Sequence, residues 1–179
     1  MEYKRGFFSG VAMIPAFLLM LFPACKCKAD YGGFKDSGTG FSFNGTVGNI
    51  YQFTFGSNSL GKYGMDSTGF NFGLFLGFMG ILVSIVIGII YMAKSDASRK
   101  LKLAQTISSG VAMFFMSPIF SAIAVYGFYN SLPDSDKNGT YAAYKEFRFG
   151  YGFVILFIFL IVIFIYNLYS TIKAKNEGF

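Results

Sequence analysis

The chain of 179 residues contains no tryptophan, no histidine and only two cysteines. Histidine is the commonest general base and the commonest metal ligand, so its absence narrows the chemistry that the chain can perform. Charged residues make up 13% of the sequence, against about 25% in soluble domains, which leaves too little polar surface for a water-soluble globule. Hydrophobic residues make up 54% and the mean hydropathy is +0.51. These values indicate a protein that resides in lipid.

Four apolar runs are long enough to cross a bilayer, which needs about 20 residues for each helix. They cover about residues 6–24, 70–92, 103–129 and 149–169, and none contains Asp, Glu, Lys or Arg. The sequence therefore predicts one all-α membrane domain, a four-transmembrane-helix bundle. Residues 25–69 then form a large outer loop and residues 130–148 a short one.

The first apolar run also fits a cleaved signal peptide. Lys4 and Arg5 precede it, and a cut after Ala29 would leave small residues at the cleavage site. We expect a retained helix instead. The other three spans keep the same orientation under either interpretation.

The distribution of basic residues predicts that both termini are cytoplasmic. The inner segments 1–5, 93–102 and 170–179 hold eight Lys or Arg in 25 residues. The outer segments hold seven in 64 residues, and six acids balance these seven. Cytoplasmic flanks of membrane helices collect Lys and Arg, which also accounts for the net charge of +6 without a nucleic-acid partner.

Small residues form a stripe on the second span. They recur mostly four residues apart and so share a helix face; they are Gly69, Gly73, Gly77, Gly80, Ser84 and Gly88. Such a stripe lets another helix approach closely. It predicts either packing within the bundle or a docking groove for another membrane protein.

The third span carries Ser108, Ser109, Ser117 and Ser121, and Pro118 interrupts it. Small and hydroxylated residues favour contact between helices, and a proline inside a span predicts a kink.

The first outer loop carries alternating aromatic residues, which predict strands. Phe41 and Phe43 flank Ser42 and precede Asn44-Gly45, a hairpin turn signal. The second alternating set is Tyr51, Phe53 and Phe55. We expect a small β-hairpin or sheet that caps the bundle, stabilised by the membrane domain, a third strand or a partner. Its aromatic face forms either the core of the cap or an interaction site.

The two cysteines, Cys25 and Cys27, stand at the start of this loop. A disulfide between them would be strained in an extended strand, and a metal site would need more ligands. We expect free or lipid-modified thiols, with an intermolecular disulfide as the alternative. Asn44 and Asn138 each begin an Asn-Gly-Thr sequon, which makes them candidate glycosylation sites on the outer side.

The predicted layout of four spans, cytoplasmic termini and a strand-rich first outer loop resembles claudin-type membrane proteins in topology. The Gly-Leu-Trp motif of that family is absent, since the chain has no tryptophan, and Cys25 and Cys27 replace two well-separated cysteines. The chain also lacks the cysteines that tetraspanins and large-pore four-span channels carry in the second outer loop. We therefore assign no family on this resemblance.

The absence of reactive groups decides between the function classes. No span holds an ionisable residue, and the cysteines lack a histidine that would activate them, so we expect no enzyme activity and no cofactor. The pattern favours a non-catalytic membrane scaffold or accessory subunit that assembles with other membrane proteins or with itself. The alternative is an oligomeric pore or small-solute transport protein, with the third-span serines as its polar wall.

Overall fold

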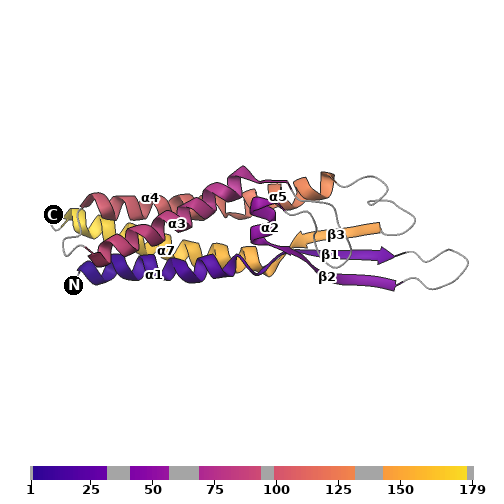
Figure 1. Ribbon diagram of the computed structural model, residues 1–179, viewed down its shortest axis with the longest axis horizontal. Coiled ribbons are helices and arrows are strands. Elements are labelled where there is room, and N and C mark those ends of the chain that lie inside the picture. The colour runs from indigo at the N-terminus through magenta and orange to yellow at the C-terminus, as the bar shows by residue number, and fades with distance from the viewer. Residues whose placement is uncertain (1, 32–40, 57–68, 94–98, 132–142, 177–179) are drawn as a thin grey trace, which may run out of the picture.

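A computed structural model describes the backbone of residues 2–31, 41–56, 69–93, 99–131 and 143–176. Side chains are described for residues 8–24, 48–56, 69–91, 100–127 and 150–173. The chain is mostly helical, and one small sheet extends from one end of the helical part (Figure 1).

Four long helices lie side by side. They are α1 (Glu2–Leu19), α3 (Phe72–Ala93), α4 (Arg99–Phe115) and α7 (Tyr151–Asn176). Helix α1 contacts α3 and α7, and α4 contacts the same two helices, so the four form a closed ring. Both chain ends lie at the end of the ring away from the sheet (Figure 1).

Two helices are long and apolar enough to cross a membrane, at Phe72–Tyr91 and Tyr151–Lys173. A third candidate is the pair formed by α4 and α5 (Pro118–Ser131). The apolar part of α1, Phe8–Leu19, is shorter. Two to three apolar helices of this kind are consistent with an integral membrane protein.

The third candidate span bends where proline predicts it. The axes of α4 and α5 differ by 41°. Pro118 has no N–H to donate to the preceding turn, and Ser117 N instead donates to Phe114 O at 3.2 Å. The predicted kink is confirmed.

The first span ends earlier than expected. It was predicted to run to residue 24, but α1 ends at Leu19 and strand β1 (Pro23–Tyr31) follows. Turn-type bonds close the helix, such as Leu21 N to Leu18 O at 3.0 Å. Pro23 cannot continue a helix and is tolerated as the first residue of a strand.

The sheet combines the two segments that were expected to be outer loops. Its order is β2-β1-β3, with β2 (Phe41–Asn49) and β3 (Ala143–Phe149) each antiparallel to the central strand β1. A register shift after Lys28 interrupts the β1–β3 pairing. The third strand comes from the segment expected to be only a short loop, and it joins this segment to residues 23–49.

Two details of the predicted cap are wrong. Asn44-Gly45 is no turn, because both residues lie inside β2, opposite Lys28 and Cys27. Tyr51, Phe53 and Phe55 form no strand, because they belong to helix α2 (Ile50–Phe55). The local reason is a capping box. The Asn49 side chain accepts from Gln52 N, and the Gln52 side chain accepts from Asn49 N, both at 2.9 Å.

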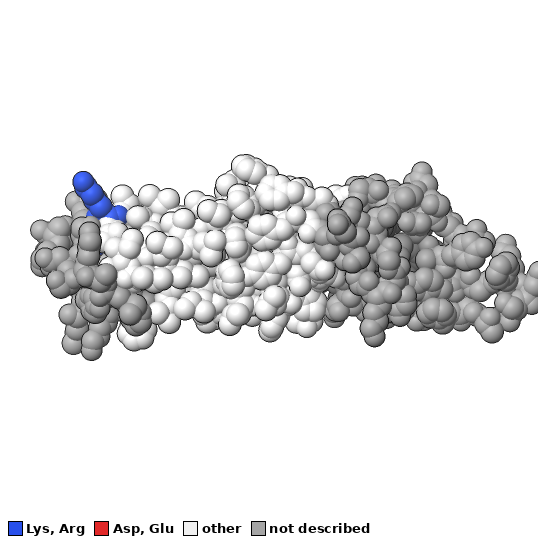
Figure 2. All heavy atoms as spheres, viewed as in Figure 1, with Lys and Arg blue, Asp and Glu red and all other residues white. Residues whose placement is uncertain are grey.

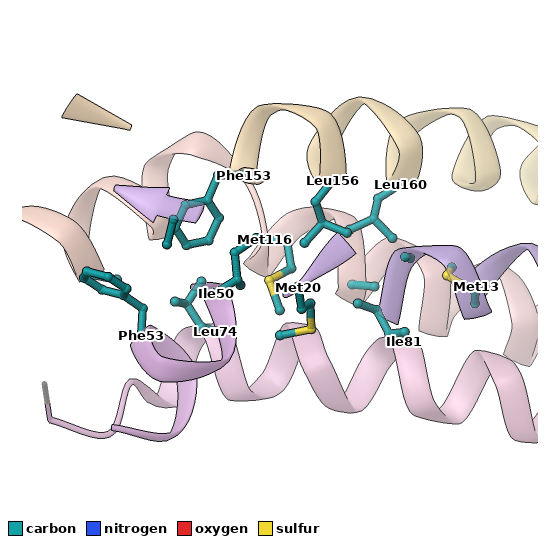
Figure 3. Packing of buried hydrophobic residues seen from close by; sticks show 14 of the residues in the cluster. Met13, Met20, Ile50, Phe53, Leu74, Ile81, Met116, Phe153, Leu156 and Leu160 are labelled. Carbon is teal, nitrogen blue, oxygen red and sulfur yellow. The ribbon is translucent and has the colours of Figure 1, made fainter. Parts of the chain in front are cut away.

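Helix α2 fills the space where the ring opens. Helix α1 has ended at this level and α5 has bent away. Ile50 and Phe53 are buried there, and Phe53 is only 2% exposed. Figure 3 shows Ile50 beside Leu74, and both belong with Phe53, Met20 and Phe153 to one buried cluster. The core is therefore continuous from the ring into the base of the sheet.

The ring is tightest near the chain ends. Gly88 of α3 meets Gly10 of α1 so closely that a β-carbon on Gly88 would lie 2.5 Å from Gly10 Cα. Only glycine fits both positions. Close backbone approach of this kind substitutes for the hydrophobic drive that helices lack in lipid.

We expect Gly88→Ala to destabilise the fold by about 1–3 kcal/mol, because the added methyl group forces α1 and α3 apart. Gly127→Ala is the matched control, since no atom lies within 4 Å of a β-carbon built there and the residue is also helical. Thermal unfolding of the detergent-purified variants provides the comparison. Equal midpoints for Gly88→Ala and Gly127→Ala would contradict the close contact.

Candidate functional site

The small residues of α3 mostly face other helices of the same chain. Four of the glycines have close neighbours: Gly73 lies against Phe120, Gly77 against Met116, Gly80 against Ala112 and Gly88 against Gly10. Ser84 Oγ lies 2.7 Å from Ser108 Oγ on α4. A β-carbon on Gly69 would meet nothing within 4 Å. Five of the six stripe residues therefore pack against other parts of the same chain.

A layer of buried and half-buried polar side chains crosses the ring at the level of Ser84, within this stripe. It contains no ionisable side chain and draws on all four helices, through Ser9 of α1, Ser84 of α3, Gln105, Thr106, Ser108 and Ser109 of α4, and Asn167 and Thr171 of α7. We call this set the polar layer. It lies toward the end of the ring that carries both termini, because Ser9 is close to the start of α1 and Thr171 is close to the end of α7.

Asn167 joins three helices within the polar layer. Its Oδ1 accepts a hydrogen bond from Ser9 Oγ at 2.5 Å, and its Nδ2 donates to Ser109 Oγ at 3.0 Å. Its backbone oxygen accepts from Thr106 Oγ1 at 3.2 Å. Since the alternative for a buried amide is an unsatisfied polar group, these bonds favour one arrangement of α1, α4 and α7.

Gln105 brings in the fourth helix. Its Nε2 donates to Ser9 Oγ at 3.1 Å and to Ser84 O at 3.3 Å. The side chain is only 3% exposed, yet its Oε1 has no hydrogen-bond partner among the described residues. Gln105 therefore links α4 to both α1 and α3, with one acceptor left unpaired.

The polar layer is suited to holding helices and unsuited to acid–base chemistry. Aliphatic hydroxyl and carboxamide groups do not ionise near neutral pH. Within the described part of the chain, no group of three or more His, Cys, Asp or Glu side chains is placed to hold a metal ion. The layer therefore offers hydrogen bonds between helices and no nucleophile–base pair.

The serines of the third candidate span lie inside the chain. Ser108, Ser109 and Ser121 are buried, and Ser117 is half-buried at the bend. Ser108 and Ser109 also donate to backbone oxygens of their own helix, at 3.1 and 3.0 Å. The exposed positions of α4 and α5 are instead large and apolar, such as Ile107, Phe114 and Ile123.

The aromatic residues of α2 pack against neighbouring helices. The Tyr51 ring contacts Phe17 and Phe78, with centroid distances of 5.5 and 6.0 Å, and its hydroxyl donates to Phe17 O at 3.1 Å. Burial raises the pKa of the Tyr51 phenol above its ordinary value, so the hydroxyl keeps its proton. The Phe55 ring lies 5.0 Å from Phe78. Of the second aromatic set, only Phe55 remains substantially exposed.

Phe41 and Phe43 lie in β2, opposite Tyr31 and Ala29 of β1. Their side chains are outside the described set, so their role in an interaction face stays a prediction.

Cys25 and Cys27 lie in the central strand, where Cys25 faces Val47 and Phe149 and Cys27 faces Gly45 and Phe147 in the register. Two residues of rise along a strand separate their Cα atoms by about 6.6 Å, near the upper limit for a disulfide. Asn44 lies within β2, and Asn138 falls outside the described residues. Thiol modification and glycosylation stay predictions.

Comparisons of the chain with protein-family models, with curated proteins and with solved structures find no match.

We expect the polar layer to show energetic coupling between α1 and α7. Ser9→Ala, Asn167→Leu and the double variant form a double-mutant cycle, measured by equilibrium unfolding in mixed micelles. The Ser9–Asn167 bond predicts a coupling of about 0.6–1.7 kcal/mol, the range found for hydrogen bonds between membrane helices. Strict additivity would show that the bond does not form.

Proposed function

We propose that the chain is a four-span membrane protein, with α1 as the fourth span. The support is the position of α1 between α3 and α7, which are the two clear candidate spans. Gly10 meets Gly88, Ser9 bonds to Asn167, and Phe17 lies 5.9 Å from Phe78. A helix that contacts both spans along its length shares their depth. Its 18 residues rise about 27 Å, of which the apolar part Phe8–Leu19 accounts for about 18 Å, against a hydrocarbon thickness of about 30 Å.

The proposed orientation places both termini in the cytoplasm and the sheet outside. Lys100, Lys102 and Lys173 all lie at the end with the termini, where Figure 2 shows blue side chains on the described surface. The excess of Lys and Arg in the short segments there is the feature that sets orientation.

The proposed activity is assembly: a non-catalytic scaffold or accessory subunit that presents the sheet outside the membrane. The observation that carries this proposal is the sheet order β2-β1-β3. Both outer segments contribute, and among the described strands β2 and β3 are each paired on one side. Unpaired edges are templates for a strand from another chain. The glycine stripe of α3 is occupied within the chain, so the sheet replaces it as the proposed contact.

The alternative of a pore has less support. A polar wall between copies would need exposed hydroxyl groups on the outer surface of the helices. The third-span serines are instead buried or half-buried, and α2 fills the outer end of the ring with Ile50 and Phe53. The interior of one chain offers a solid core, which fits a structural subunit.

The test is the mass of the particle extracted in a mild detergent, with all co-purifying chains identified by mass spectrometry. We expect a defined complex larger than the 19.8 kDa of one chain, because the edge strands pair with a partner. A tagged, unrelated four-span protein from the same membranes defines the background. A stable monomer without any partner would contradict the scaffold proposal.

A further inference from the structure

One face of α7 combines tyrosine rings and a lysine near the end that carries the termini. Tyr166, Tyr169 and Lys173 are spaced by three and four residues, so they lie on the same face of the helix. Tyr169 is 63% exposed and Tyr166 is 40% exposed. The two tyrosines of this tyrosine–lysine face point away from the ring, because the buried side of α7 is formed by Leu160, Ile163 and Asn167, while Lys173 is half-buried.

The depth of these residues matches the boundary of a bilayer. Tyr151 is also exposed and begins the same span. Eighteen residues of helix separate Tyr151 from Tyr169, a rise of about 27 Å, against a hydrocarbon core of about 30 Å. The two tyrosines therefore mark the two interfaces, where aromatic rings anchor spans. Lys173 lies about 6 Å beyond Tyr169, at the level of the lipid phosphates.

The surrounding charge favours an anion. In the sequence, the segments 1–5, 93–102 and 170–179 on this side hold eight Lys or Arg against three acids, Glu2, Asp96 and Glu177. Large apolar side chains lie beside the tyrosine–lysine face, because Ile165 and Ile172 are exposed on α7. An anionic headgroup with acyl chains therefore meets both a positive charge and an apolar surface.

We propose that the tyrosine–lysine face of α7 binds an anionic phospholipid of the leaflet at the terminal end. The Lys173 ammonium binds a phosphate oxygen, the Tyr169 hydroxyl donates to the headgroup region, and the acyl chains lie along Ile165 and Tyr166. A zwitterionic lipid gains less here, because its own cation is repelled by the basic helix ends.

Native mass spectrometry of the delipidated full chain, titrated with phosphatidylglycerol or with phosphatidylcholine of the same acyl chains, tests the proposal. We expect tighter binding of phosphatidylglycerol, and a loss of about fivefold in that preference for Lys173→Gln, the effect of one lysine at the surface. Lys100→Gln is the matched control. It removes the same charge at the same end, but Leu103 and Ala104 stand one turn into the membrane instead of a tyrosine.

Tyr169→Leu is expected to lower the same preference while Tyr169→Phe retains part of it. Free glycerol phosphate at millimolar concentration separates the two sources of the anion, and we expect it not to displace the lipid. Equal losses for Lys173→Gln and Lys100→Gln would overturn the proposal in favour of diffuse attraction. Equal binding of the two lipids by the wild-type chain, or displacement by glycerol phosphate, would overturn it as well.

Discussion

The fold depends on hydrogen bonds made where water is scarce. Ser9, Gln105 and Asn167 come from three helices, and each has a group that would be costly to bury alone. Their hydrogen bonds to one another form only if α1, α4 and α7 stand at one level and in one rotation. The Gly10–Gly88 contact adds α3 at almost the same depth. These hydrogen bonds and the close backbone contact thus fix how the helices pack at the end of the ring that carries the termini. The apolar core continues from there.

At the opposite end, the bend between α4 and α5 and the early end of α1 leave a space that another helix fills. Because α1 ends at Leu19 and α5 bends away by 41°, the four helices alone would leave the core uncovered at this end. Helix α2 fills the opening and is held there by Ile50 N, which donates to Met20 O at 3.0 Å, and by Asn71 N, which donates to Thr54 O at 3.0 Å. The sheet then continues from the same level, with Gly150 N donating to Ala24 O at 2.8 Å. The ring, α2 and the sheet are therefore joined into one structural unit, as the proposed scaffold requires.

The helices and the kink could be predicted from the sequence because a long apolar run and Pro118 each determine the structure of their own segment. The strand assignment of Tyr51, Phe53 and Phe55 was wrong because it relied on the three alternating aromatic residues. The neighbouring capping signal, Asn49 followed three residues later by Gln52, predicts a helix there. Strand β3 could have been found from Phe147 and Phe149 alternating with Arg148, yet its pairing with β1 depends on residues more than 100 positions away. Only some residues of the polar layer could be recognised from the sequence. Gln105, Thr106 and Asn167 stand out as polar residues near span ends, but their meeting with Ser9 depends on helix rotation, which periodicity does not give.

The central claim is that all four long helices cross the membrane, with the sheet on one side and both termini on the other. Labelling of single cysteines with a membrane-impermeant maleimide tests it, in a chain with Cys25 and Cys27 changed to serine. Tyr3→Cys and Asn176→Cys report the two ends, and Ser131→Cys reports the end of α5. The account predicts labelling of Ser131→Cys in intact cells, and of Tyr3→Cys and Asn176→Cys only after permeabilisation. Labelling of Tyr3→Cys together with Ser131→Cys in intact cells would contradict it, because α1 would then not cross the membrane.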